Sequence, residues 1–267
     1  MRKSLALMLA LTVFLWLGTG AGVIAGPLGD RIAAYPEWTG PPPTRPAIGD
    51  LLYPQWMAGH WQISSTLVDL DAPLAPDIVT PGFEGNRELL DKPIDFPVKF
   101  IPRQALPALG ILGRGATRRS NLDEMPIVAD RAYNGQQITE AYLGAEFVKS
   151  VEADPAIPNE QIVILRGDRQ LLSTVIERAS ESPEPDRFVA TEIVQQVFQS
   201  EGDAPVYLNT VETTSDYRYH PSDAEHPITA DQYSAIYLSP RDASYAIAKK
   251  QPVALYHYTL TFTLIKP

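Results

Sequence analysis

The stretch that decides the fold class is Tyr256-His257-Tyr258-Thr259-Leu260-Thr261-Phe262-Thr263-Leu264, near the end of the chain. Large apolar or aromatic side chains alternate strictly with His257 and the three threonines. Because successive side chains of a β-strand point to opposite faces, this pattern predicts a strand with one buried and one solvated face. Such half-buried strands are typical of antiparallel sheets.

The same period of two recurs along the chain from residue 56 onward. Further strands are expected at 61–67, 96–101, 127–133, 161–166, 170–178, 187–199, 205–219 and 229–238. Short connections between consecutive strands favour antiparallel neighbours. One short helix is expected at Gln136–Phe147, where Ile138, Ala141 and Tyr142 share a face. With about eight to ten strands, closure into an antiparallel barrel removes exposed sheet edges.

Proline divides the remaining chain into parts. Of the 25 prolines, 14 lie between Pro27 and Pro107. Since proline cannot donate to a helix or sheet ladder, residues 26–55 are predicted to form a proline-rich extended arm. Residues 56–267 then form the β-barrel domain, with a long irregular insertion at 71–126.

The N-terminus has the three parts of a secretory signal peptide. Arg2 and Lys3 precede a 13-residue apolar run, Leu5–Leu17, and small residues follow up to Ala25. That run is shorter than the about 20 residues that span a bilayer, so we expect residues 1–25 to be cleaved before Gly26. An uncleaved N-terminal anchor is the alternative, whereas cleavage leaves no stable membrane span.

Charge and cysteine content exclude several classes of function. The formal net charge of −10 disfavours nucleic acid as a partner, because counterion release needs lysine and arginine contacts. The absence of cysteine excludes disulfides and thiolate metal sites. No Asn-x-Ser/Thr glycosylation site occurs either, and an exported protein of this kind suits a bacterial periplasm or an equivalent lumen.

The sequence Gly59-His60-Trp61 at the start of the first barrel strand resembles the entry motif of the lipocalin (calycin) family. This resemblance implies a lipocalin-like barrel in which Trp61 is a structural plug at the closed end. It also implies that Gly59 lets the chain turn beneath the barrel.

A longer resemblance is carried by five segments, which together extend over about residues 35–265. They are Gly49–Trp56 leading into Gly59–Trp61, then Pro81–Arg87, Ala129–Gly135, Leu165–Gln170 and Val211–Thr214. The chain resembles an uncharacterised family of exported cyanobacterial and plastid proteins with a domain of unknown function. The resemblance implies a periplasmic or thylakoid-lumen location and supplies no activity or cofactor.

Candidate ligand-binding residues form a local basic patch in this acidic chain. Between Lys99 and Arg119 the charged residues are all basic, and they include Arg103, Arg114, Arg118 and Arg119. Such a patch can hold a ligand carboxylate or an acidic partner, or it can be a solvated loop. His257, on the threonine-rich face, is either a polar ligand contact or a surface residue.

Signals for catalysis or metal binding are weak. The loop His220–His226 holds two imidazoles and two carboxylates, but its spacing matches no established ligand pattern. There is no Gly-x-Ser-x-Gly elbow. We therefore predict no metal, no cofactor and no named catalytic residue.

Two functions remain from these observations. The first is non-enzymatic binding of a small apolar or amphipathic ligand, such as a pigment or lipid, in the barrel. The second is a structural or assembly factor that docks on a periplasmic or lumenal photosynthetic complex through the arm and the basic loop. A barrel-based enzyme is a third, weaker option.

Overall fold

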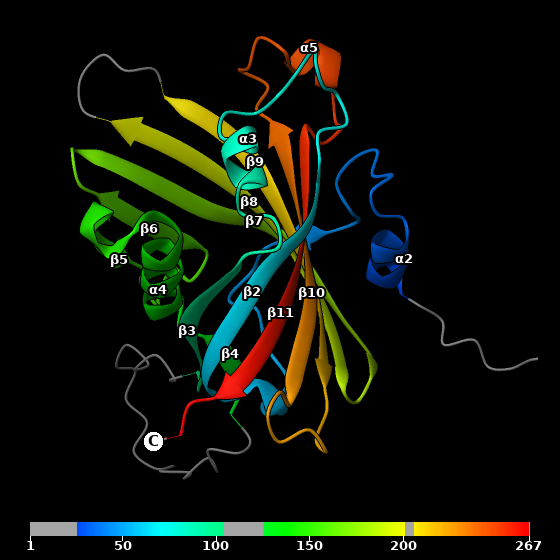
Figure 1. Ribbon diagram of the computed structural model, residues 1–267, viewed down its shortest axis with the longest axis vertical. Coiled ribbons are helices and arrows are strands. Elements are labelled where there is room, and N and C mark those ends of the chain that lie inside the picture. Colours follow the sequence, from blue (N-terminus) through cyan, green and yellow to red (C-terminus); the bar gives the residue numbers. More distant parts are fainter. Residues whose placement is uncertain (1–25, 104–124, 201–205, 267) are drawn as a thin grey trace, which may run out of the picture.

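A single antiparallel sheet dominates the computed structural model, which describes residues 26–103, 125–200 and 206–266. Ten strands follow one another in the order β4-β3-β2-β11-β10-β9-β8-β7-β6-β5 and curl into a half-barrel (Figure 1). Their bounds are β2 Gly59–Asp71, β3 Pro93–Pro102, β4 Ile127–Ala129, β5 Val148–Glu152, β6 Glu160–Leu165, β7 Arg169–Glu184, β8 Arg187–Ser200, β9 Tyr207–Tyr219, β10 Ile228–Leu238 and β11 Ala254–Leu264. The antiparallel, barrel-like fold expected from the sequence is confirmed.

β11 lies at the centre of this sheet, between β2 and β10. Leu260 and Phe262 are buried on the face that we call inner, as their alternation predicts. A register shift between His257 and Tyr258 interrupts the pairing with β2. The extra residue is Val68 of β2, so the bulge bends β2, whereas the alternation of β11 continues through it.

The inner face is filled by apolar side chains around Trp61. Trp61 is 4% exposed, and its indole Nε1 donates to the Met57 carbonyl at 2.8 Å. Its cluster draws on the helical turn Gln55–Met57 and on β2, β3, β4, β10 and β11: Met57, Trp61, Ile63, Phe96, Val98, Phe100, Ile127, Ile228, Ala230, Leu260 and Phe262. The interior at this end of the half-barrel is therefore a packed core.

Gly59 makes the close approach beneath Trp61 possible. Its φ is +149°, and a Cβ atom there would come within 3.1 Å of the Trp61 Nε1 atom. Any other residue would be strained in its backbone and crowded by the indole. Both facts fit the turn expected at Gly59, and the role of Trp61 as a barrel plug stays a prediction.

A helix takes the place of a strand where the two ends of the sheet approach each other. Helix α4, Arg131–Leu143, packs against β3 on one side and against β5 and β6 on the other (Figure 1). The Asn134 side chain accepts from the Lys99 amide at 2.7 Å and donates to the Lys99 carbonyl at 3.0 Å. It thereby supplies the hydrogen bonds that a neighbouring strand would give to this edge of β3.

The segment 46–54 joins the same two ends of the sheet below α4. It begins in β1, Arg45–Pro46, which pairs with β7, and the Ala47 amide then donates to the Ile176 carbonyl at 2.9 Å. At its other end the Tyr53 amide donates to the Ile127 carbonyl of β4 at 2.9 Å. We call α4 together with residues 46–54 the seam of the half-barrel.

The N-terminal part of the chain covers the opposite, outer face of the sheet. Helix α2, Pro27–Ala33, lies on the side of β10 and β11 away from α4 (Figure 1). Trp38 is 4% exposed and packs with Tyr233, Tyr237 and Leu255. Leu28 and Trp38 are therefore buried on the chain's own sheet, whereas Pro27, Ala33, Ala34 and Pro36 are exposed.

A buried ion pair fixes the N-terminal segment to this face. Glu212 on β9 is fully buried, and the Arg31 guanidinium donates to both of its oxygens, at 3.1 and 2.7 Å. The Tyr237 hydroxyl donates to the same carboxylate at 2.7 Å, and the Arg31 guanidinium also lies 3.7 Å from the centre of the Trp38 ring. The contacts of Arg31 with Glu212 therefore join residues 26–38 to the middle of the sheet.

Several elements differ from the expectations of the sequence. The arm is not extended throughout, because Pro27 occupies the first helical turn, where its fixed φ and missing N–H favour α2. The strand expected at 127–133 is wrong beyond Ala129, because the Asp130 side chain accepts from the Tyr133 amide at 3.2 Å and begins α4. Two further short helices are α3, Phe83–Arg87, and α5, Tyr245–Ala248. Among the described residues, no helix is long and apolar enough to cross a membrane.

Candidate functional site

A pocket of about 390 Å³ opens at the seam. It lies between the end of β3, β4, the first turn of α4 and the connection from β5 to β6, and residue 50 reaches it from the segment 46–54. Its lining consists of Asp50, Ile101, Pro102, Arg103, Val128, Ala129, Asp130, Arg131, Ala132, Ala153, Asp154, Pro155 and Pro158. Most of the walls are therefore apolar, and a few charged groups stand among them.

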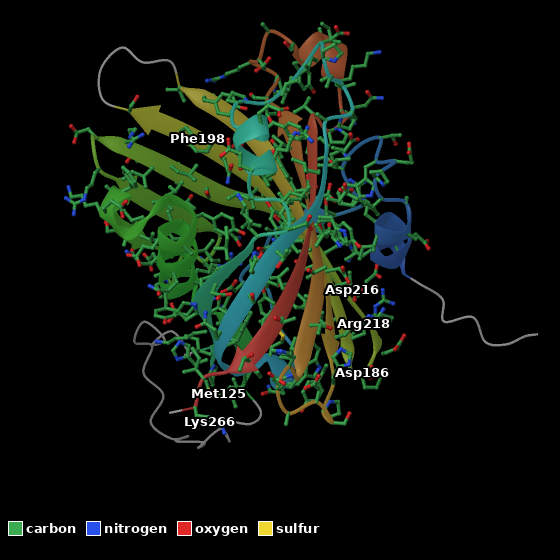
Figure 2. The ribbon with its side chains drawn as sticks, in the orientation of Figure 1. Met125, Asp186, Phe198, Asp216, Arg218 and Lys266 are labelled. Carbon is green, nitrogen blue, oxygen red and sulfur yellow. The ribbon has the colours of Figure 1, made fainter. Side chains whose placement is uncertain are left out.

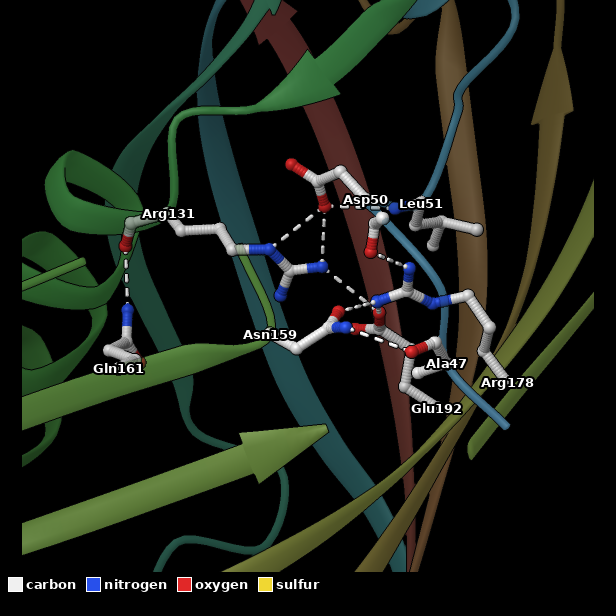
Figure 3. Close-up of polar contacts among 9 residues, drawn as sticks. Ala47, Asp50, Leu51, Arg131, Asn159, Gln161, Arg178 and Glu192 are labelled. Carbon is white, nitrogen blue, oxygen red and sulfur yellow. Dashed lines mark hydrogen bonds and ion pairs between the residues drawn. The ribbon is translucent and has the colours of Figure 1, made fainter. Parts of the chain in front are cut away.

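Four charged side chains form a balanced network behind this pocket (Figure 3). Arg131 donates to Asp50 Oδ1 through Nε at 3.0 Å and Nη2 at 2.8 Å, and Nη2 also donates to Glu192 Oε1 at 3.0 Å. Arg178 donates to the same Glu192 oxygen at 2.8 Å. Two guanidinium groups thus face two carboxylates, and their side chains are only 10–20% exposed.

The network also holds the backbone of the segment 46–54. Arg178 Nη1 donates to the Gly49 carbonyl at 2.6 Å, and its Nη2 donates to Asn159 Oδ1 at 2.7 Å. Asn159 Nδ2 in turn donates to the Ala47 carbonyl at 3.1 Å. Figure 3 shows these side chains converging from β7, β8, α4 and the segment itself. The wall of the pocket is therefore held by side-chain bonds where no strand ladder runs.

Burial and charge explain the ionisation of this region. Burial opposes the charge on Arg131, but the neighbouring carboxylates of Glu192 and Asp50 outweigh that effect and raise its pKa. Burial raises the pKa of the Tyr53 hydroxyl well above its ordinary value, and Tyr217 and Glu192 add to this shift. Arg131 is therefore a permanent cation and Tyr53 a neutral hydroxyl at the back of the site.

The structure separates the residues that the sequence singled out for ligand binding. Arg103 lies on the pocket wall and is exposed, with its amide bonded to the Pro126 carbonyl. Arg114, Arg118 and Arg119 lie outside the described residues.

His257 lies on the outer face, away from the pocket. Its ring stacks on Tyr233 with centroids 4.3 Å apart, and its Nε2 lies 2.8 Å from Asp231 Oδ1. His257 and Arg103 are therefore not brought into one site.

The histidine-containing loop at 220–226 does not gather its side chains around a common point. His220 Nε2 lies 3.0 Å from the Thr229 hydroxyl, whereas His226 Nδ1 lies 3.2 Å from that of Thr263. Asp223 accepts from the amides of Glu225 and His226. Within the described ranges, no group of three or more histidine and carboxylate side chains is placed to hold a metal ion.

Sequence reasoning missed most of the network. Asp50 and Arg131 stand in two of the segments that carry the family resemblance, but the sequence does not show that these segments meet. Glu192 carries a detectable signal, because it follows Phe188 and Ala190 at intervals of two and so occupies the inward phase of β8. A charged residue at an inward position calls for a buried partner.

These observations define a class, an antiparallel half-barrel with a packed inner core and a pocket at its helical seam. Residues 46–266 match the family model described as "Domain of unknown function (DUF6816)", and the chain belongs to that family. Neither the curated proteins nor the solved structures gave a match.

Proposed function

We propose that this protein is a non-enzymatic binding protein for a small amphipathic molecule, held in the seam pocket. The observation that carries this proposal is the pocket itself: about 390 Å³, apolar over most of its walls, with five charged side chains among its thirteen lining residues. Sites for small molecules have this size and this composition. The packed core around Trp61 supports a ligand position at the seam rather than in the centre of the barrel.

The charged residues of the pocket suggest how such a ligand is oriented. Arg131 and Asp50 are joined in the network, so their charges largely compensate each other. Asp130 and Asp154 accept from the backbone amides of Tyr133 and Ala156, and Arg103 is the exposed cation of the lining. We expect the apolar part of the ligand to lie between Ile101, Val128 and Pro158, and its polar head group to lie beside Arg103. The ligand would then contact both the apolar walls and the charged group of the pocket.

A pocket-filling substitution tests this proposal. Ala153 lines the pocket, whereas Ala156 belongs to the same connection between β5 and β6 and does not line it. We expect Ala153→Trp to abolish saturable binding of a dansyl-labelled medium-chain fatty acid, as followed by its fluorescence. Ala156→Trp is the matched control and should bind like the unmodified protein. Equal binding by the two variants, or no saturable binding by the unmodified protein, would contradict the proposal.

A second substitution tests the orientation of the ligand. Arg103→Gln should weaken binding of the fatty-acid probe by about tenfold, the value of one charge-assisted hydrogen bond. It should leave binding of the corresponding uncharged alcohol unchanged. Equal weakening of both probes would place the head group elsewhere.

The proposed setting is an exported protein, as the N-terminal sequence and the resemblance to lipocalin-like and photosynthetic exported proteins suggest. The predicted cleavage before Gly26 supports a location in a periplasm or a thylakoid lumen. Intact-mass measurement of the protein from an exporting host tests it. Retention of residues 1–25 would refute cleavage.

A further inference from the structure

A second cleft lies at the opposite end of the sheet from β4, where β6 turns into β7. It has a volume of about 570 Å³ and shares no lining residue with the seam pocket. Its lining consists of Lys149, Ile164, Leu165, Arg166, Gly167, Asp168, Arg169, Gln170, Gln199 and Ser200. Phe198, labelled in Figure 2, marks the neighbouring end of β8.

This cleft concentrates positive charge in an acidic protein. Lys149, Arg166 and Arg169 line it together with one carboxylate, that of Asp168, whereas the whole chain carries −10. Among residues 26–103, 125–200 and 206–266, no ion pair joins any of these three cations to a carboxylate. Within the described ranges these cations thus differ from Arg131 and Arg178, which are held in ion pairs.

Local backbone geometry places these cations around the cleft. The pairing of β5 with β6 shifts register between Val148 and Ser150, so Lys149 is the bulged residue. Bulges of this kind change the direction of a side chain and are common near functional sites. On the other side of the cleft, Gly167 and Asp168 turn the chain with φ values of +75° and +54°.

Hydrogen bonds fix the floor and one wall of the cleft. Arg169 donates through Nε and Nη2 to the Arg166 carbonyl, both at 3.3 Å, which folds its guanidinium back over the turn. Gln170 Nε2 donates to Gln199 Oε1 at 2.7 Å across the β7–β8 pair. The cleft thus combines cations from two strands and a turn with fixed side-chain amides.

We propose that this cleft binds a phosphate group, presented either by a small phosphate monoester or by the head group of an anionic phospholipid. Guanidinium and ammonium groups recognise phosphate oxygens. The Nε–Nη2 edge of Arg169 is held by the Arg166 carbonyl, so its Nη1 remains for a phosphate, together with the Arg166 guanidinium and the Lys149 ammonium. The amides of Gln170 and Gln199 supply neutral hydrogen bonds beside them. The cleft is separate from the seam pocket, so this proposal does not depend on the function proposed for that pocket.

Binding of three probes to the mature chain tests this inference: inorganic phosphate, glycerol 3-phosphate, and vesicles of phosphatidylglycerol compared with phosphatidylcholine. Titrations at constant ionic strength with chloride separate specific from general charge effects. Arg166→Gln/Arg169→Gln should weaken binding of the preferred probe by about tenfold or more. Arg87→Gln/Lys92→Gln removes the same charge from another exposed surface and is the matched control.

The outcomes separate the two sources of the phosphate. Saturable binding of a soluble probe that is lost only in the cleft variant supports a phosphate monoester. Selective vesicle binding, lost in the same variant, supports a lipid head group. Absence of saturable binding to all probes, or equal loss in both double variants, would overturn the proposal. All four substituted residues are exposed, so circular dichroism should show an unchanged fold.

Discussion

Replacement of Arg31 by methionine should destabilise the protein strongly, because its partner Glu212 is fully buried. The substitution removes the two hydrogen bonds to the carboxylate, of 2.7 and 3.1 Å, and a third to the Tyr237 hydroxyl, of 2.9 Å. It leaves the carboxylate with the hydroxyl groups of Tyr237 and Thr214. Removing one member of a buried ion pair costs about 3–5 kcal/mol. For a domain of this size, that corresponds to a decrease of roughly 6–20 °C in Tm.

Urea and thermal unfolding of the mature chain measure this effect, and Arg87→Met is the control. Arg87 pairs with Glu84 on the surface, where the two side chains are 52% and 71% exposed. Surface pairs of this kind contribute about 0–1 kcal/mol. The double variant Arg31→Met/Glu212→Gln should regain most of the loss, because no buried charge is left unpaired.

Limited proteolysis adds a local measurement of the same contact. If the N-terminal segment is released in Arg31→Met, cleavage within residues 26–44 should become faster than in the Arg87→Met control. Equal unfolding midpoints and equal cleavage rates for the two variants would refute the argument that this ion pair anchors the segment.

Three further predictions concern the core, the seam and alkaline pH. Gly59→Ala should lower the free energy of unfolding by about 1–3 kcal/mol, because residue 59 has a positive φ and the added Cβ would crowd Trp61. Gly85→Ala is the control and should leave the free energy of unfolding unchanged, because no atom lies within 4 Å of the added Cβ. Urea unfolding measures both variants. Asn134→Ala should cost about 1–3 kcal/mol, because the Lys99 amide loses its partner while the Lys99 carbonyl keeps the Asp130 amide, and hydrogen exchange of the Lys99 amide should accelerate. Burial, with Asp231 and Asp216, raises the pKa of Tyr233 to about 12. Since the folded state holds the Tyr233 proton more tightly than the unfolded state does, its contribution to stability is complete below about pH 10 and is lost as the pH rises toward 12. The urea midpoint and the tyrosinate absorbance should therefore change together across this range. A urea midpoint that does not depend on pH would contradict this prediction.

Alternation along the strands made most of the fold predictable. Leu260 and Phe262 are buried, as their positions in the alternating pattern of β11 predict. In a half-buried strand, apolar residues occupy the buried face and polar residues the solvated face, so the sequence alternates between them. Strand β5 was missed because Lys149, Ser150 and Glu152 give it little apolar character. Helix α2 was missed because Pro27 suits both an extended chain and a first helical turn.

The candidate site was less predictable, because it depends on contacts between distant residues. Asp50, Arg131 and Glu192 come from three separate parts of the chain, and no local pattern indicates that they meet. Arg103 was found because its charge contrasts with the acidic composition, which is a property of the sequence alone. His257 lies on the outer face of β11, away from Arg103. The sequence alone did not show whether the threonine-rich face of this strand is the outer or the inner one.

The half-barrel is closed at the seam by side chains, and for this reason a substitution in the pocket can change ligand binding without changing the stability of the core. Between neighbouring strands a continuous ladder of backbone bonds leaves no room for a ligand. At the seam, Asn134 and the Arg131 network make the connections with side chains, and the pocket lies beside them. Of its lining residues, Ala129 is the one that packs against the core around Trp61. A substitution that fills this pocket, such as Ala153→Trp, should therefore block binding with little change in the free energy of unfolding. A large loss of stability in that variant would show that the pocket belongs to the packed core.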